Sequence, residues 1–341
     1  MAATAENLQE STFKQLVQRR ETGVFFALVV LVAYMSIQSP YFLGQENIFN
    51  VLRNMSSITV MAIGMTMIIV TGGIDLSIGS TLGVSSMLAA RMMFASSEVF
   101  LAGHSPWLAI PCAVLFGGLI GLFNGLIITK LSVNPFITTL GMLSIGRGLT
   151  YLLATGIRGT VASNIPMKNE LVNFIGIGKI GWEGFQIPMQ VVIMFVLVVL
   201  FSLFLQYTVL GRQIYAVGSN AEAARLTGVN VHFVQIFVFT LTGFLCALAG
   251  LMNSGLVGAA VTNAGAGSEM DVIAAVIIGG TSLSGGERTI IGAVIGAAIM
   301  AVLKNAFVLL HLPVYMQTIS IGVVIILAVA LDGLRRRRGD S

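Results

Sequence analysis

The sequence predicts an all-α, polytopic membrane protein with about ten transmembrane helices and both termini in the cytoplasm. Three observations lead to this prediction. Of the 341 residues, 56% are hydrophobic and only 9% are charged, and the mean hydropathy is +0.94. A soluble domain carries about 25% charged residues, so these apolar residues exceed what one soluble core can bury. Apolar runs long enough to cross a bilayer recur along the chain, and most positive charges fall between them on one predicted side.

The chain divides into three regions. Residues 1–22 are polar and include Lys14, Arg19 and Arg20, which predicts a cytoplasmic N-terminal segment. The apolar run 23–37 resembles a signal peptide, but the following residues, Gln38 to Tyr41, do not fit a small-residue cleavage site. We therefore expect this run to be the first span of a transmembrane domain covering residues 23–332. Residues 333–341 are a basic cytoplasmic tail.

Ten apolar stretches, bounded by polar or glycine-rich residues, are predicted to span the bilayer. They are residues 23–37, 48–71, 76–94, 107–129, 136–155, 187–207, 233–252, 272–283, 290–310 and 315–331. The eighth is short enough to be a half-helix instead of a full crossing. Residues 156–186 are polar and rich in glycine, which predicts an irregular surface loop or a partly re-entrant one.

The distribution of positive charge supports this topology. With both termini inside, the inner loops and tails hold eleven of the eighteen Lys and Arg residues, as the positive-inside rule expects. These are Lys14, Arg19, Arg20, Lys130, Arg212, Arg225, Arg288 and Arg335 to Arg338. The net charge of +4 comes from the four arginines that follow the last span, so we expect no binding of nucleic acid.

The chain is organised around a polar segment, residues 210–231, which lies between two apolar runs. Asn220 is placed to cap a short alanine-rich helix, and Gly228 is placed to end it. The small side chains of such a helix let another surface pack closely. We interpret this segment as a contact surface for a partner protein on the cytoplasmic side.

Three motifs together carry a resemblance to a known family. Residues 211–228 follow the pattern G-R-x-x-x-A-x-G-x-N-x-x-A-A-x-x-x-G, residues 72–80 read GGIDLSIGS, and residues 134–141 read NPFITTLG. In this order and at these separations, the chain resembles the ribose-type permeases of ATP-binding-cassette sugar importers. The resemblance covers about residues 41–332.

The resemblance implies the membrane subunit of an importer in the bacterial inner membrane, which moves a monosaccharide or similar polyol by alternating access. It implies an ATPase partner that binds the ATP, a periplasmic sugar-binding protein and a second permease subunit, which is commonly an identical copy in a homodimer and otherwise a sister permease. No cofactor is expected on this chain. The helix within 218–228 is expected to dock on the ATPase, with Gly218, Asn220, Ala223, Ala224, Arg225 and Gly228 as the coupling residues.

Polar residues within the apolar runs are candidates for a translocation pathway or for structural roles, because charge inside a membrane is costly. Asp75 either braces a helix broken at Gly72 and Gly73 or simply caps the next helix, and the two interpretations are compatible. Asn134 precedes a proline at a predicted helix start. The hydroxyl groups of Thr138 and Thr139 either bond back to their own helix or, with Asn124, line a polar pathway.

Three further charged residues lie in or next to apolar runs. Arg147 lies within a predicted span and needs a partner that the sequence does not name. Glu269 and Asp271 precede the short eighth span. Asp271 is favourable there through the helix dipole alone, whereas Glu269, with Asn253 and Asn263, could bind a polyhydroxylated ligand.

Several kinds of chemistry are not expected. The three histidines, His104, His232 and His311, lie far apart, so no metal site is expected. No catalytic constellation is evident, and we expect no enzyme activity. Residues 283–287, LSGGE, resemble the signature loop of ATP-binding-cassette ATPases, but the chain has no G-x-x-x-x-G-K-[ST] phosphate loop. We interpret them as a tight turn next to Arg288.

Two alternatives from other classes remain open. The first is a secondary transporter, driven by protons or sodium, in which Asp75, Arg147, Glu269 and Asp271 form an ion relay. Such a carrier does not need the docking helix. The second is a membrane scaffold or receptor, which does not require polar residues along several spans.

Overall fold

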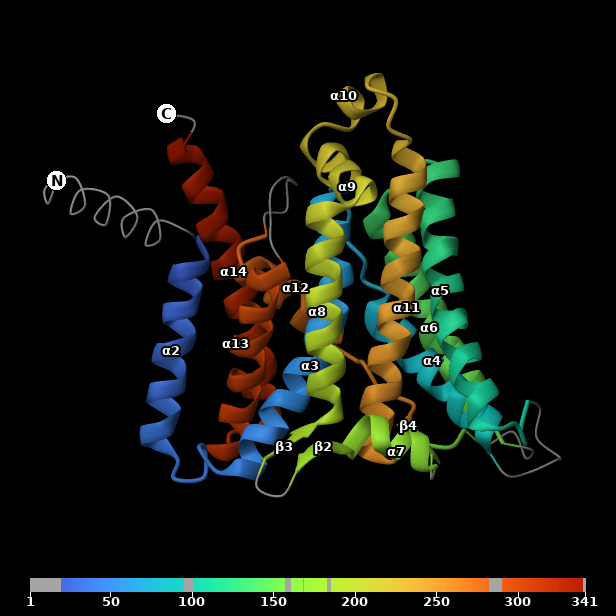
Figure 1. The fold of residues 1–341 in the computed structure, drawn as a ribbon, viewed down its shortest axis with the longest axis vertical. Coiled ribbons are helices and arrows are strands. Elements are labelled where there is room, and N and C mark those ends of the chain that lie inside the picture. The colour runs from blue at the N-terminus through green and yellow to red at the C-terminus, as the bar shows by residue number, and fades with distance from the viewer. Residues whose placement is uncertain are drawn as a thin grey trace, which may run out of the picture.

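The computed structural model describes residues 20–94, 101–156, 161–167, 169–182, 185–281 and 290–339, with the side chains of residues 20, 21, 185, 328 and 331–339 left aside. These residues form thirteen helices and four short strands. The long helices run between two ends of the molecule (Figure 1). The strands and α7 (Glu170–Ile177) lie at one end, called here the strand end, and α9 (Val209–Ser219) and α10 (Ala221–Leu226) lie at the other, called here the α10 end.

The remaining elements follow in chain order. The helices are α2 (Arg20–Gln38), α3 (Gln45–Val70), α4 (Ile78–Met93), α5 (Pro106–Lys130), α6 (Pro135–Ala154), α8 (Met189–Tyr207), α11 (Val231–Val257), α12 (Ser268–Ile278), α13 (Ile290–Leu309) and α14 (Val314–Gly339). The strands are β1 (Asn164–Pro166), β2 (Lys179–Trp182), β3 (Phe185–Pro188) and β4 (Ala259–Val261).

Each of the ten predicted spans overlaps one helix, and the prediction of a helical membrane protein is confirmed. Among the described residues, six helices are long and apolar enough to cross a membrane: α3, α5, α6, α8, α11 and α13. The apolar parts of α2 and α14 are shorter. The helices α4 and α12 have 16 and 11 residues, which is less than the roughly 20 that a full crossing needs. The count of ten crossings therefore stays a prediction.

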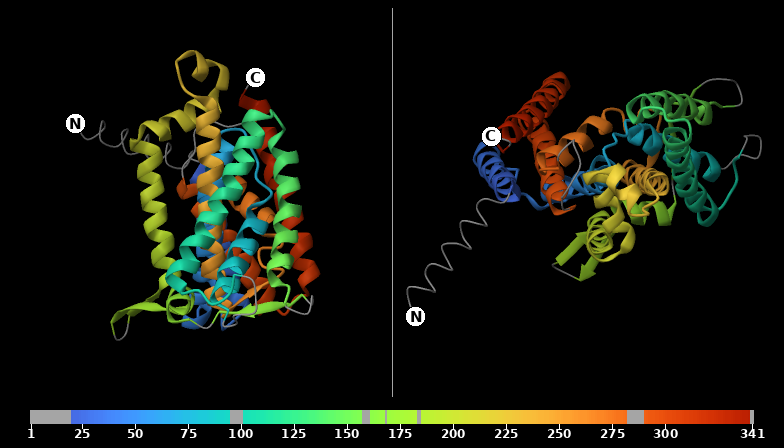
Figure 2. Two further views of the ribbon diagram at one scale, coloured as in Figure 1. Left: turned by 90° about the vertical axis from the view of Figure 1, so that its right-hand side faces the viewer. Right: turned by 90° about the horizontal axis from the view of Figure 1, so that it is seen from above.

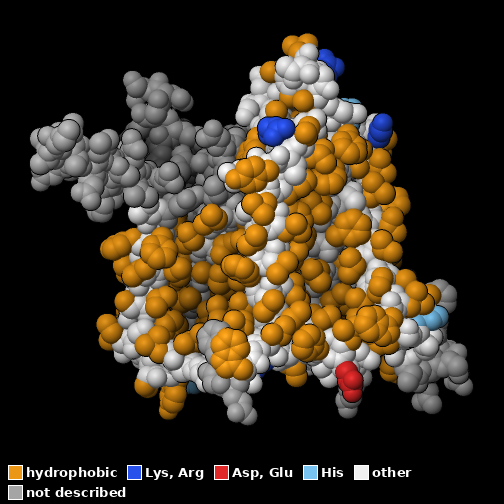
Figure 3. Space-filling model, in the orientation of Figure 1, with side chains coloured by type: hydrophobic (Ala, Val, Ile, Leu, Met, Phe, Trp, Pro, Cys, Tyr) orange, Lys and Arg blue, Asp and Glu red, His pale blue; other side chains and the backbone are white. Residues whose placement is uncertain are grey.

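The first and last helices agree with the predicted placement of the termini on one side. The start of α2 and the end of α14 lie at the α10 end (Figure 1), and seen from above both helices lie at the edge opposite α5 and α6 (Figure 2). Hydrophobic side chains cover the face between the two ends, and Lys and Arg side chains appear at the α10 end (Figure 3). That this end faces the cytoplasm stays a prediction.

The expectation of an irregular loop over residues 156–186 is wrong in part. Strands β2 and β3 form an antiparallel hairpin, and β1 pairs antiparallel with the distant β4. Between them, α7 begins where the Asn169 side chain accepts a hydrogen bond from the Leu171 amide. Gly176 lies within α7 and Gly181 within β2, so glycine in this stretch does not exclude regular structure. Ile165, Met167 and Val172 are buried against the helices.

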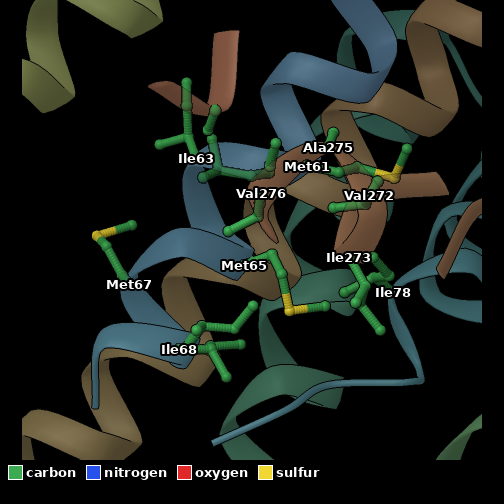
Figure 4. Close-up of a cluster of buried hydrophobic side chains, with 14 of the residues drawn as sticks. Met61, Ile63, Met65, Met67, Ile68, Ile78, Val272, Ile273, Ala275 and Val276 are labelled. Atoms are coloured by element: carbon green, nitrogen blue, oxygen red, sulfur yellow. The ribbon is translucent and has the colours of Figure 1, made fainter. Parts of the chain in front are cut away.

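Helix α3 lies at the centre of the largest apolar cluster. It is apolar around most of its circumference, and such a helix is stable only when neighbours surround it. Figure 4 shows Met61, Met65 and Ile68 of this helix gathered with Ile78 from the start of α4 and Ile273 from α12. The core therefore joins the two short helices to the central long one.

Glycine brings α5 and α11 into backbone contact, as small residues do where membrane helices pack closely. A methyl group on Gly121 of α5 would lie 2.1 Å from the Phe239 carbonyl oxygen of α11. A methyl group on Gly243 of α11 would lie 2.1 Å from the Gly117 carbonyl oxygen of α5. No side chain fits at these positions, so the two helices form one rigid pair.

Candidate functional site

Two segments re-enter the molecule from opposite ends. Helix α3 ends at the α10 end, where Val70 touches α9, and residues 71–77 then lead back inward to the start of α4. Helix α11 ends at the strand end, where Gly258 adopts a left-handed conformation, and residues 259–267 lead inward to the start of α12. In each case a long helix is followed by a break and a short helix.

The two short helices begin beside each other inside the protein. A methyl group on Gly79, in the first turn of α4, would lie 2.2 Å from the Gly265 carbonyl and 2.5 Å from Oε2 of Glu269, in the first turn of α12. One turn further along α4, a methyl group on Gly83 would lie 2.9 Å from the Ala264 carbonyl oxygen. The glycine face of α4 thus receives the second re-entrant segment. We call this region the half-helix junction.

Asp75 holds the first re-entrant segment in shape. Its Oδ1 accepts hydrogen bonds from the amide of Ser77 at 2.7 Å and from the Ser77 hydroxyl at 2.6 Å. The Asn124 side-chain amide of α5 donates to Ser77 Oγ at 2.9 Å. All three residues are buried. Asp75 therefore braces the turn that precedes α4, whose N-cap residue is Ser77, and Asn124 is hydrogen-bonded to the same turn. A role of either residue in a pathway stays a prediction.

The start of α6 matches its predicted signals. The Asn134 side chain accepts a hydrogen bond from the Phe136 amide, so it caps the helix that opens at Pro135. Thr139 Oγ1 bonds back to the Pro135 carbonyl at 2.9 Å and reaches the Ile74 carbonyl of the first re-entrant segment at 3.3 Å. Thr138 is buried, and its hydroxyl has no hydrogen-bond partner within the described residues.

Arg147 lies at the half-helix junction. One of its Nη1–H groups donates to the Ala264 carbonyl at 2.5 Å, and this contact names the partner that the sequence leaves open. The side chains of Arg147 and Glu269 both reach the glycine face of α4: a methyl group on Gly79 would lie 2.5 Å from Glu269 Oε2, and one on Gly83 would lie 3.3 Å from Arg147 Nη1. No direct ion pair joins the two residues, and Glu269 Oε2 is buried without a hydrogen bond from the described part of the chain.

Asp271 is paired with a residue that the sequence alone does not single out. Its carboxylate forms a salt bridge with the ammonium of Lys304 on α13. Asp271 is buried, and Lys304 is half-buried. A lysine inside an otherwise apolar run was the signal that could have found this pair. By contrast, Asn253 is half-buried within α11 and Asn263 is exposed. Their grouping with Glu269 around a polyhydroxylated ligand stays a prediction.

The predicted docking helix is present as α10. Asn220 accepts a hydrogen bond from the Ala223 amide at 2.9 Å, which confirms the cap, and Gly228 follows the helix with φ +87°. Arg225 pairs with Glu222 on the exposed surface at 2.8 Å. Figure 1 shows α10 projecting beyond the ends of the long helices.

The side chains of α10 divide into an inner and an outer face. Ala224 is only 5% exposed and belongs to the main core cluster, so it anchors α10 to the protein and is not open to a partner. Ala223 is exposed, and the neighbouring Leu226 is 79% exposed. Leu226 was missed because one leucine in an alanine-rich helix does not reveal from the sequence which face it occupies.

Two short helices begin at breaks inside an apolar protein, and an exposed helix projects at one end. Broken helices of this kind are features of membrane transport proteins. The family model described as branched-chain amino acid transport system / permease component matches residues 47–329. The chain belongs to this family of permease components.

The most similar relatives include permeases for sugars. The ribose import permease of Haemophilus influenzae is 37% identical over 97% of both chains. The galactose/methyl galactoside import permease of Escherichia coli K12 is 34% identical over 94% of this chain and 96% of its own. The D-allose transport system permease of the same organism is 36% identical over 92% of this chain and 91% of its own. No solved structure matches the chain.

These relatives confirm the predicted resemblance to ribose-type permeases and the predicted multi-pass membrane location. The LSGGE stretch and Arg288 lie outside the described residues, so the predicted turn there stays a prediction.

Proposed function

We propose that this chain is the membrane permease subunit of an ATP-driven importer that moves a monosaccharide or similar polyol across the bacterial inner membrane. The observation that carries the proposal is the similarity to ribose, galactoside and allose permeases along nearly the whole chain. The family description names amino acids, but the individual relatives above are named for sugars, and this favours a sugar as the cargo.

The energy comes from a partner ATPase that docks on α10. This helix projects from the membrane domain and presents Ala223 and Leu226 outward, with the Glu222–Arg225 pair beside them. An exposed leucine with a rim of charged groups is the usual composition of a small protein contact. Asn220 caps the start of α10 and Gly228 follows its end, while Gly218 packs α9 against α3. Ala224 packs α10 into the core of the permease.

The permease has two conformations, and its partner proteins bind them with different affinities. Transport follows from the switch between the two. The ATPase binds at the α10 end and a sugar-binding protein at the strand end. A second copy of this chain completes the pathway. The permease performs no chemistry on the sugar, and ATP stays on the partner.

The test begins with affinity purification of the tagged chain from its native membrane in mild detergent, followed by mass spectrometry. We expect an ATPase with a phosphate loop to co-purify. The purified complex, reconstituted in vesicles with the sugar-binding protein, is then expected to take up labelled D-ribose, D-galactose or D-allose only when ATP is supplied on the ATPase side. A chain that purifies alone and drives uptake with an ion gradient would instead support the secondary transporter.

A further inference from the structure

We propose that the transported solute binds at the half-helix junction, between Arg147 and Glu269 and beside Tyr151, and that it is a neutral polyhydroxylated molecule. This inference rests on the proposed function and adds where this chain touches the sugar.

The two charged groups at the junction are incompletely satisfied. Arg147 gives one described hydrogen bond, to the Ala264 carbonyl, although a guanidinium carries five N–H donors. Glu269 Oε2 is buried and receives no hydrogen bond from the described residues. A carboxylate oxygen left in this state destabilises the protein unless something else completes its bonding. The two groups lie at successive glycines of α4, Gly79 and Gly83, and do not close into an ion pair.

The chemistry of the missing partner follows from the two groups. Their charges cancel, so a neutral solute leaves no net charge inside the membrane domain. A hydroxyl group donates to a carboxylate and also accepts from a guanidinium. A molecule with neighbouring hydroxyl groups can therefore bridge Glu269 and Arg147, as a sugar does. A sugar phosphate would bring negative charge that this site does not balance.

An aromatic ring lies next to these charges. Tyr151 follows Arg147 by four residues on α6, which places both on one face of the helix. Its side chain is half-exposed. A tyrosine ring offers an apolar surface with a polar tip, and this combination suits a ligand whose ring has C–H groups on its faces and hydroxyl groups at its edge.

The backbone around the junction is built for close approach. The glycine face of α4, with Gly79 and Gly83, leaves no side chain between α4 and the second re-entrant segment. That segment descends from β4 at the strand end, where the proposed sugar-binding protein docks. In many transporters the substrate lies where broken helices begin in the middle of the membrane. Here two such helices begin together from opposite directions.

A zwitterionic amino acid is the competing occupant, because its ammonium and carboxylate groups could pair with Glu269 and Arg147. The sugar is favoured because the most similar relatives above carry sugar names and because the exposed neighbour of Arg147 is a tyrosine. L-leucine therefore serves as the second probe in the test.

The test uses the assembled complex, comprising this chain and its ATPase. Arg147→Gln and Glu269→Gln are each expected to lower ATP-driven uptake of the transported sugar by about tenfold or more, because a hydrogen bond to a charged group is lost. Arg147→Lys, which keeps the charge, is expected to recover part of the uptake. Ile145→Ala, a change of a half-exposed side chain on the same helix, is the matched control and is expected to leave uptake unchanged.

A second measurement reports binding directly and does not depend on turnover. Tyr151→Cys is introduced together with Cys112→Ala, while Cys246, which is fully buried, stays in place. We expect the new thiol to react with a polar methanethiosulfonate reagent, and D-ribose, D-galactose or D-allose to slow that reaction whereas L-leucine does not. Co-purification of the ATPase with each variant shows that the complex still assembles.

The outcomes separate the two proposals. Absence of ATP-driven sugar uptake by the unmodified complex overturns the proposed function. Normal uptake by Arg147→Gln and Glu269→Gln, or labelling that no sugar slows, in a complex that does transport sugar overturns the site alone. Protection by L-leucine and not by the sugars overturns the assignment of the solute class.

Discussion

The carbonyl oxygen of Val70 faces Gly218 so closely that a methyl group on Gly218 would lie 1.9 Å from it. The end of α9 therefore rests directly on the end of α3, one residue before the first re-entrant segment begins. A displacement of α9 and α10 cannot be absorbed by a side chain at this contact. If α10 docks the ATPase as proposed, that partner would act next to the segment that Asp75 holds, which leads to the half-helix junction.

This contact predicts that Gly218→Ala impairs the protein. The added methyl group meets a backbone oxygen, and forcing extra volume into such a contact costs about 1–3 kcal/mol. We expect lower thermal stability in detergent and weaker ATP-driven uptake. Gly141→Ala on α6, where nothing lies within 4 Å, is the control and should leave both unchanged. A Gly218→Ala protein with wild-type stability and uptake would contradict this role.

The two faces of α10 predict opposite effects of substitution. Leu226→Glu is expected to abolish co-purification of the ATPase while leaving the melting temperature unchanged, because exposed substitutions alter stability by only about 0.5 kcal/mol. Ala224→Leu is expected to destabilise the α9–α10 region first, since Ala224 is packed in the core. Hydrogen exchange of residues 221–226 and pull-down of the ATPase measure the two effects. Full ATPase binding by Leu226→Glu would remove α10 as the docking site.

The cap at Asn220 predicts a local effect on α10. Loss of a capping side chain costs about 1 kcal/mol, and a six-residue helix has little other stabilisation of its own. Asn220→Ala should therefore speed amide hydrogen exchange throughout α10, whereas Asn220→Asp, which keeps an acceptor oxygen, should not. Equal exchange in the two variants would show that the cap is dispensable.

The network around Asp75 predicts different effects for a conservative substitution and for removal of the carboxylate. Asp75→Asn keeps an oxygen that can accept from the Ser77 amide, and we expect nearly normal assembly. Asp75→Ala removes both hydrogen bonds to Ser77 and leaves buried donors unsatisfied, at about 1–3 kcal/mol for each. Thermal unfolding and uptake of the two variants provide the comparison. If both behave like the wild type, Asp75 has neither role.

The Asp271–Lys304 salt bridge predicts a recoverable defect. Removing one partner leaves a charge without its counterpart, which costs about 3–5 kcal/mol at a fully buried site and less here, because Lys304 is half-exposed. Asp271→Asn and Lys304→Met should each destabilise the protein, and the double variant should recover much of the loss. An ion relay would instead require that the double variant stay inactive while stable.

Composition and the lengths of the apolar runs were sufficient to predict a helical membrane protein, because only an apolar environment can accommodate so many hydrophobic residues. The local signals were also reliable. Asn134 and Asn220 cap helices as their positions predict, since a capping bond depends only on neighbouring residues. The three motifs, read together, were enough to indicate the family.

The tertiary structure alone decided which polar residues share a site. Arg147 and Glu269 lie more than a hundred residues apart, and their meeting depends on two breaks that turn α4 and α12 inward from opposite ends. Asp271 was separated from them by its pairing with Lys304. The sequence also did not decide that Ala224 faces the core and Leu226 faces outward. The direction of a side chain on a short helix depends on what the rest of the fold places against it.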